Sequence, residues 1–89
     1  MAKVAFITGA TRGIGRQIAI EFAKDGYDIA FNYRKENEEL ENTKKEIEKI
    51  GVQVLAVKGD VANFENCENF VKQVIERFGQ IDVLVNNAG

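Results

Sequence analysis

The sequence predicts an α/β fold in which a parallel β-sheet carries helices on both faces. Short runs rich in β-branched and aromatic residues alternate with segments of helical periodicity along the 89 residues. Glycines at positions 26, 51 and 79 each follow a helix-like segment and precede an apolar run, which is where glycine commonly ends a helix. Alternating strands and helices pair in parallel through right-handed crossovers, so we expect the strand order 3-2-1-4.

Four segments are predicted to be strands because they are apolar with little strict alternation, as in strands that are covered on both faces. They are Val4–Thr8, Tyr27–Tyr33, Val52–Lys58 and Ile81–Asn86. Three segments between them are predicted to be helices: Gly13–Asp25, Glu36–Ile50 and Asn63–Phe78. In the second helix glutamates come early and lysines late, an order that complements the helix dipole.

The third predicted helix has an apolar stripe at three- and four-residue spacing. Its members are Cys67, Phe70, Val71, Val74, Ile75 and Phe78. We expect this stripe to face the sheet and the cysteine to fill the core, since nothing nearby in the sequence would make its thiol reactive.

Composition excludes several classes of function. With a net charge of −2 and mixed signs along the chain, there is no basic surface for nucleic acid and no polybasic membrane anchor. No apolar run approaches the ~20 residues of a membrane span, Met1 leads into a strand with no signal peptide, and the single cysteine cannot form an internal disulfide. We therefore expect a cytoplasmic protein without nucleic-acid or membrane partners.

The chain contains no histidine and no serine. A Ser-His-Asp triad and a Cys-His pair cannot be built without them, and a zinc site would have one thiol and no imidazole. Hydrolase and metalloenzyme functions are therefore disfavoured, and no metal-binding residues are predicted.

A glycine-rich segment follows the first predicted strand and opens the first helix: Thr8-Gly9-Ala10-Thr11-Arg12-Gly13-Ile14-Gly15. Such a turn directs backbone N–H groups to one point, where a pyrophosphate can bind. We expect Gly9 to allow the turn, Gly13 to allow close approach of phosphate, and Gly15 to let the helix pack on the sheet. The alternative is that these glycines only serve a tight turn. The strand–turn–helix context favours a dinucleotide site that includes all residues from Gly9 to Gly15.

Charge at the end of the second strand bears on the cofactor. An NAD site usually places Asp or Glu about 20 residues after the loop, where it binds the ribose 2′-hydroxyl. Here the strand ends in Asn32-Tyr33-Arg34-Lys35. A guanidinium from Arg34, with Arg12, would instead bind a 2′-phosphate, so we expect NADP(H). The alternative is that both arginines are ordinary surface charges.

The spacing Gly-x-x-x-Gly-x-Gly, together with Asn86-Asn87-Ala88-Gly89, resembles the short-chain dehydrogenase/reductase family, and within it the reductases of 3-oxoacyl-(acyl carrier protein). The resemblance implies a Rossmann-type sheet. It also implies that the Asp60 carboxylate accepts from the adenine amino group, that the Val61 N–H meets the ring, and that Asn87, Ala88 and Gly89 line the cofactor site. The sequence leaves open that Asp60 caps the third helix and that the two asparagines are only turn residues.

In that family a Ser and a Tyr-x-x-x-Lys pair carry the chemistry. No serine is present, and Tyr27 and Tyr33 are followed four residues later by Phe and Asn. We therefore expect residues 1–89 to be a single dinucleotide-binding domain that is incomplete and inactive alone. The resemblance implies that the full-length protein is a homotetramer. It also implies a reductase of fatty acid synthesis, whose ketone substrate is a small molecule or is bound to acyl carrier protein. The alternatives are a non-catalytic dinucleotide-binding or sensing module and, less favoured, a flavodoxin-like or receiver-type domain. A receiver needs acids where the first strand ends, and that strand ends in Thr8.

Overall fold

The computed structural model describes residues 2–10, 13–60 and 63–87, and within these it contains the predicted alternation of strands and helices. The elements in chain order are β1 (Val4–Ile7), α1 (Gly13–Lys24), β2 (Asp28–Tyr33), α2 (Glu38–Ile50), β3 (Val54–Lys58), α3 (Phe64–Phe78) and β4 (Val83–Val85). Each element agrees with its predicted counterpart to within one or two residues at either end.

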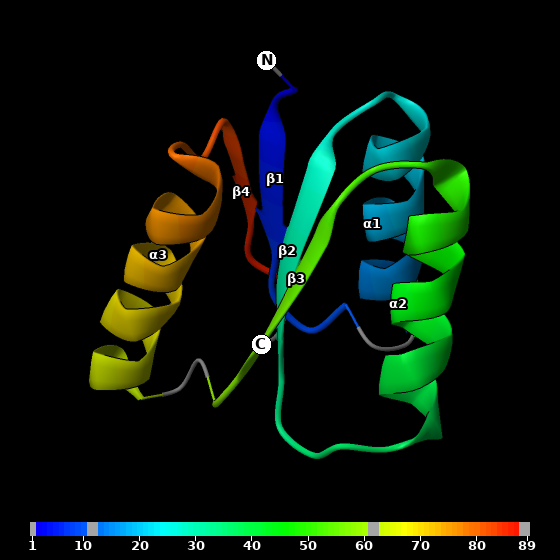
Figure 1. Cartoon of the computed structure of the whole chain (residues 1–89). Helices are drawn as coiled ribbons and strands as arrows, with labels where there is room; N and C mark the ends of the chain where they lie inside the picture. Colours follow the sequence, from blue (N-terminus) through cyan, green and yellow to red (C-terminus); the bar gives the residue numbers. More distant parts are fainter. Residues whose placement is uncertain (1, 11–12, 61–62, 88–89) are drawn as a thin grey trace.

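The sheet is parallel throughout and its strand order is β3-β2-β1-β4, which confirms the predicted topology. The register aligns Ile7 of β1 with Phe31 of β2 on one side and with Val85 of β4 on the other. Strand order thus reverses at the β1–β4 pair. Because all strands run the same way, their carboxyl ends gather at one edge of the sheet, the lower edge in Figure 1.

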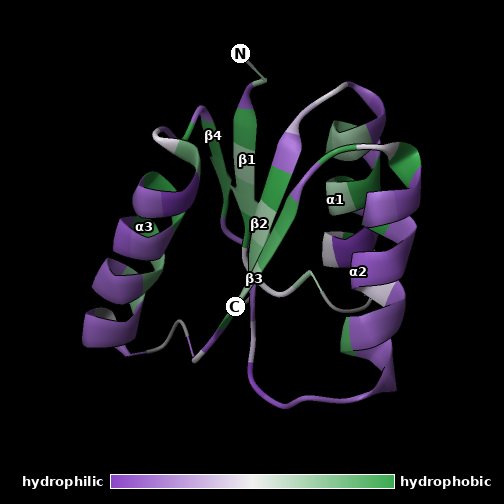
Figure 2. Cartoon of the chain, in the orientation of Figure 1, coloured by the Kyte–Doolittle hydropathy of each residue, from purple (hydrophilic) through white to green (hydrophobic). Residues whose placement is uncertain are grey.

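The helices cover both faces of the sheet: α1 and α2 lie on one face and α3 lies on the other (Figure 1). Alternate side chains of each strand point to opposite faces, so neighbouring residues enter different cores. Ile7, Ile29 and Phe31 pack on the α1 and α2 side. Phe6 packs on the α3 side with Phe70. Figure 2 shows the result: the central parts of the strands are coloured hydrophobic, whereas α2 and much of α3 are coloured hydrophilic.

The apolar stripe of α3 is only partly buried, which corrects the sequence prediction. Phe70 and Val74 are buried at 2% and 0% exposure, whereas Val71 and Ile75 are each 42% exposed and Cys67 is partly exposed. Among the described elements α3 is the one helix on its face of the sheet. The flanks of its stripe therefore have no neighbouring described helix to pack against.

Local signals end the helices where the sequence predicted. Gly51 and Gly79 adopt left-handed conformations with φ of 106° and 84°, and their N–H groups bond back to the last turns of α2 and α3. Asn37 and Asn63 cap the amino ends of α2 and α3. No helix in the described parts of the chain is long and apolar enough to cross a membrane.

Candidate dinucleotide site

Most of the predicted site residues that the structure describes lie at the carboxyl edge of the sheet. The glycine turn follows β1, Arg34 follows β2, Asp60 follows β3 and Asn87 follows β4. Thr11, Arg12, Val61, Ala88 and Gly89, which were also predicted, lie outside the described residues. In an open parallel sheet this edge, next to the reversal of strand order, is where ligands bind.

Close packing explains the glycine at position 15. A Cβ atom there would collide with the carbonyl oxygen of Gly9 and would lie 2.5 Å from the side-chain nitrogen of Asn87. The first turn of α1 therefore approaches both the glycine turn and the end of β4. The predicted packing role of Gly15 is refined in this way: the helix packs closely against the glycine turn and against Asn87, which follows β4, as well as against β1 and β2 of the sheet.

A different reason applies to Gly13, which begins α1 with φ of 64° and has no atom of the described residues within 4 Å of where a Cβ would be. Glycine is needed there for the backbone conformation. Next to it Ile14 is 74% exposed, whereas the side chain of Ala10 is completely buried. The Ile14 side chain is therefore open to a ligand at this helix start, whereas the side chain of Ala10 is turned into the core.

Thr8 connects β1 to the end of β4. Its buried hydroxyl accepts a hydrogen bond from the N–H of Asn87 at 2.9 Å. The same hydroxyl can donate to the side-chain oxygen of Asn86 at 3.3 Å or to the carbonyl oxygen of Val85 at 3.4 Å. The side-chain amide of Asn87 donates to the carbonyl of Gly9 at 3.3 Å. The two asparagines therefore brace the sheet against the glycine turn, and are more than turn residues.

Asn32 was not among the predicted site residues. It is 3% exposed, its Oδ1 accepts from the N–H of Gly9 at 3.0 Å, and its Nδ2 donates to the carbonyl of Gly59 at 3.1 Å. A signal was present in the sequence, because Asn32 directly follows the apolar run Ile29–Phe31 inside a strand that should be covered on both faces, where a polar side chain needs a partner.

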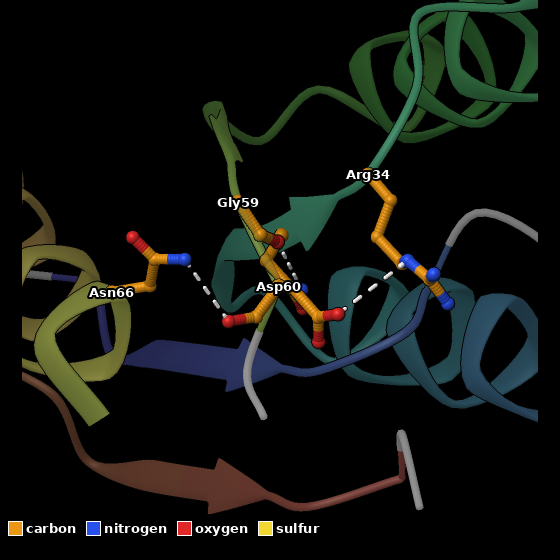
Figure 3. A network of polar contacts seen from close by, with 5 residues as sticks. Arg34, Gly59, Asp60 and Asn66 are labelled. Carbon is orange, nitrogen blue, oxygen red and sulfur yellow. Dashed lines mark hydrogen bonds and ion pairs between the residues drawn. The ribbon is translucent and has the colours of Figure 1, made fainter. Parts of the chain in front are cut away.

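Arg34 and Asp60 pair across the ends of β2 and β3, with Arg34 Nε 3.8 Å from Asp60 Oδ2 (Figure 3). On the other side of Asp60 the Asn66 side chain of α3 donates to the Asp60 backbone carbonyl at 3.2 Å. Both charged side chains are well exposed, at 77% and 48%. The alternative that Asp60 caps α3 is wrong, because Asn63 holds that position and accepts from Glu65 and Asn66.

The fold and this edge define a Rossmann-type α/β domain with a glycine turn at the reversal of strand order. Comparison with known proteins gives the family: the family model for short chain dehydrogenase matches residues 3–89. The chain therefore belongs to the short-chain dehydrogenase family of oxidoreductases.

Similar proteins within the family differ in substrate. The chain is 45% identical over 89 residues to the 3-oxoacyl-[acyl-carrier-protein] reductase FabG of Staphylococcus aureus, covering 100% of this chain and 36% of that protein. L-sorbose reductase of Gluconobacter frateurii, solved with NADPH and L-sorbose, is 45% identical with a TM-score of 0.90, over 99% of this chain and 34% of that one. The chain thus spans about a third of the length of these relatives.

Carveol dehydrogenase of Mycobacterium avium, solved with NAD, is 32% identical with a TM-score of 0.89, over 98% of this chain and 35% of that one. The same fold is therefore found in relatives that were solved with either nicotinamide cofactor.

Proposed function

We propose that these residues are the NADPH-binding part of an oxidoreductase that reduces a ketone, and that the ketone is a 3-oxoacyl thioester carried by acyl carrier protein. The observation that carries the proposal is the glycine turn that opens α1 beside the β1–β4 pair. The first N–H groups of a helix have no partner within the helix, and the start of α1 lies at the edge where open parallel sheets bind their ligands, which supports a phosphate site here. The relatives solved with NADPH and NAD support a nicotinamide dinucleotide in this position.

The residues present fit such a cofactor. Gly15 leaves room for α1 to approach the glycine turn, and none of the described residues crowds the position of a Gly13 side chain. We propose that backbone groups of the turn and of Gly13 and Ile14 hold the diphosphate, that Asp60 and Val61 hold the adenine, and that the segment from Asn87 to Gly89 lines the ribose. Once bound, the nicotinamide supplies a hydride.

Charge favours the phosphorylated cofactor. Arg34 stands at the end of β2 where a carboxylate would select NAD, and 77% of its side chain is exposed although its Nε pairs with Asp60. Because the pair is long and solvated, it holds the guanidinium weakly, and the exposed donors can bind a 2′-phosphate. We propose that Arg12 adds a second cation at the same phosphate.

The reaction needs residues that these 89 do not include, since the chain has no serine and no Tyr-x-x-x-Lys. Under the proposal they belong to a longer, cytoplasmic, tetrameric polypeptide. A non-catalytic dinucleotide-binding module is the second candidate, favoured by that same composition. Turnover of 3-oxoacyl thioester by the complete polypeptide supports the reductase, and NADPH binding without turnover of any ketone supports the module.

The cofactor is tested by titrating NADPH, NADH and FMN into the complete polypeptide and into its Arg12→Ala/Arg34→Ala variant. Loss of charge-assisted contacts of about 1.5–3 kcal/mol should raise the Kd for NADPH about ten- to a hundredfold and leave that for NADH nearly unchanged. Arg77→Ala is the matched control, because Arg77 is an exposed arginine in the last turn of α3. Equal losses of affinity for NADPH and NADH would contradict NADPH selectivity. Binding of FMN without binding of NADPH or NADH would contradict a nicotinamide dinucleotide as the cofactor.

A further inference from the structure

Asn32 connects the two loops that the proposed function assigns to different parts of the cofactor. It lies in β2, between β1 and β3. Its amide reaches Gly9, which is 23 positions earlier in the chain, and Gly59, which is 27 positions later. We propose that Asn32 is a positioning residue that sets the separation between the glycine turn and the β3 turn. This inference rests on the proposed function, because it assigns a role in binding a dinucleotide across both turns.

The backbone ladder explains why a side chain is needed there. The β1–β2 register ends at Ile7 and Phe31, so Gly9 lies past the last paired residue of its strand. The β2–β3 register ends at Tyr33 and Lys58, and beyond it Gly59 donates one further bond to the Tyr33 carbonyl at 2.8 Å. The Asn32 amide continues the hydrogen bonding past both ladders.

An amide supplies both of the groups that the bridge requires. The N–H of Gly9 can only donate and the carbonyl of Gly59 can only accept, so the residue between them must present an acceptor to one and a donor to the other. A buried carboxylate would repel the carbonyl, and an aliphatic side chain would leave both backbone groups without this partner. Leaving a buried polar group unpaired costs about 1–3 kcal/mol.

The consequence for binding follows from preorganisation. A dinucleotide would contact the glycine turn with its diphosphate and the β3 turn with its adenine, so a fixed separation lowers the cost of ordering both loops. Asn32 would contact no 2′-phosphate under this scheme, because that group is assigned to Arg34 and Arg12. Its loss should therefore weaken NADP⁺ and NAD⁺ equally, unlike the loss of the arginines.

The test uses Asn32→Leu and Asn32→Asp in the complete polypeptide, with Asn42→Leu and Asn42→Asp as matched controls on the exposed side of α2. Kd values for NADP⁺ and NAD⁺ are measured by calorimetry. We expect Asn32→Leu to raise both values about tenfold or more, by the same factor, and the controls to stay within about twofold of the parent.

Asn32→Asp makes the test independent of whether the leucine variant folds. At about pH 8 the introduced carboxylate repels the Gly59 carbonyl. The protonated carboxyl group has one donor and one acceptor, so it restores the bridge. Burial raises the pKa of such a carboxyl group, which brings its protonation into a range where binding can be measured. We expect weak binding at about pH 8 and recovery toward parental affinity at about pH 5.5. Comparison with the parent at each pH isolates the effect of the introduced carboxyl group, because the parent carries the same Arg34–Asp60 pair and binds the same cofactor.

Parental binding with Kd ratios near one for both Asn32 variants would overturn the inference and leave the proposed function standing. A fall in melting temperature with unchanged Kd would do the same, because it assigns Asn32 to stability alone. Failure of the parent to bind either nucleotide would overturn the proposed function and this inference with it.

Discussion

Arg34 and Asp60 form an ion pair that joins the ends of β2 and β3, with 3.8 Å between the Arg34 Nε and the Asp60 Oδ2. The pair is solvated, since the two side chains are 77% and 48% exposed. It therefore contributes little to folding. Under the proposed function, the Arg34 guanidinium would instead bind the 2′-phosphate of the cofactor.

We expect Arg34→Ala to lower the free energy of unfolding by less than about 1 kcal/mol, because exposed ion pairs are screened and entropically costly. Arg16→Ala is the matched comparison: Arg16 pairs with Glu46 at 2.7 Å between α1 and α2, and its side chain is 33% exposed. Urea unfolding should give the larger loss for Arg16. A greater loss for Arg34 would show that its pair with Asp60 is structural.

Replacing Thr8 by Val tests the connection between β1 and β4. Valine has nearly the same shape but leaves the N–H of Asn87 without the acceptor that lies 2.9 Å away, so we expect a loss of about 1–3 kcal/mol. Thr8→Ser keeps the hydroxyl and should recover most of the stability. Denaturant midpoints measure both variants, and equal midpoints for the two would argue against the hydrogen bond.

Gly15→Ala should be much more damaging than an alanine at an uncrowded glycine. The added methyl group collides with the Gly9 carbonyl, which cannot move without displacing the turn, so a loss of about 2–3 kcal/mol is expected. Gly26→Ala is the control, because Gly26 has φ of 92° and no atom near its absent Cβ; the left-handed backbone alone should cost about 1 kcal/mol. Thermal unfolding of both variants would contradict this account if Gly26→Ala proved the more destabilising.

The α3 stripe offers two valines on one helix for a matched comparison. Val74 is completely buried against the sheet, so Val74→Ala should cost about 2 kcal/mol through lost burial and a residual cavity. Val71 is 42% exposed, and its replacement by Ala should change stability by no more than about 0.5 kcal/mol. Similar losses at the two positions, measured by chemical unfolding, would mean that Val71 is covered in the folded protein.

Sequence reasoning predicted the glycine turn more completely than the surroundings of that turn. The turn can be recognised in the sequence because its glycines lie within a few residues of one another, between a strand pattern and a helix pattern. The bridge through Asn32 was missed because its partners, Gly9 and Gly59, are far from it in the chain. For Asp60 the sequence left two roles open, and the position of Asn63 at the start of α3 excluded one of them.

The sequence by itself determined the kind and order of the elements and the parallel topology, because hydrophobic periodicity and helix-ending glycines act over neighbouring residues. Only the tertiary structure decided which polar groups meet at the carboxyl edge: Asn32 with two glycines, Arg34 with Asp60, and Thr8 with Asn87. It also decided which flank of α3 stays exposed. These outcomes depend on strand register and helix placement, which bring together residues that no local pattern in the chain connects.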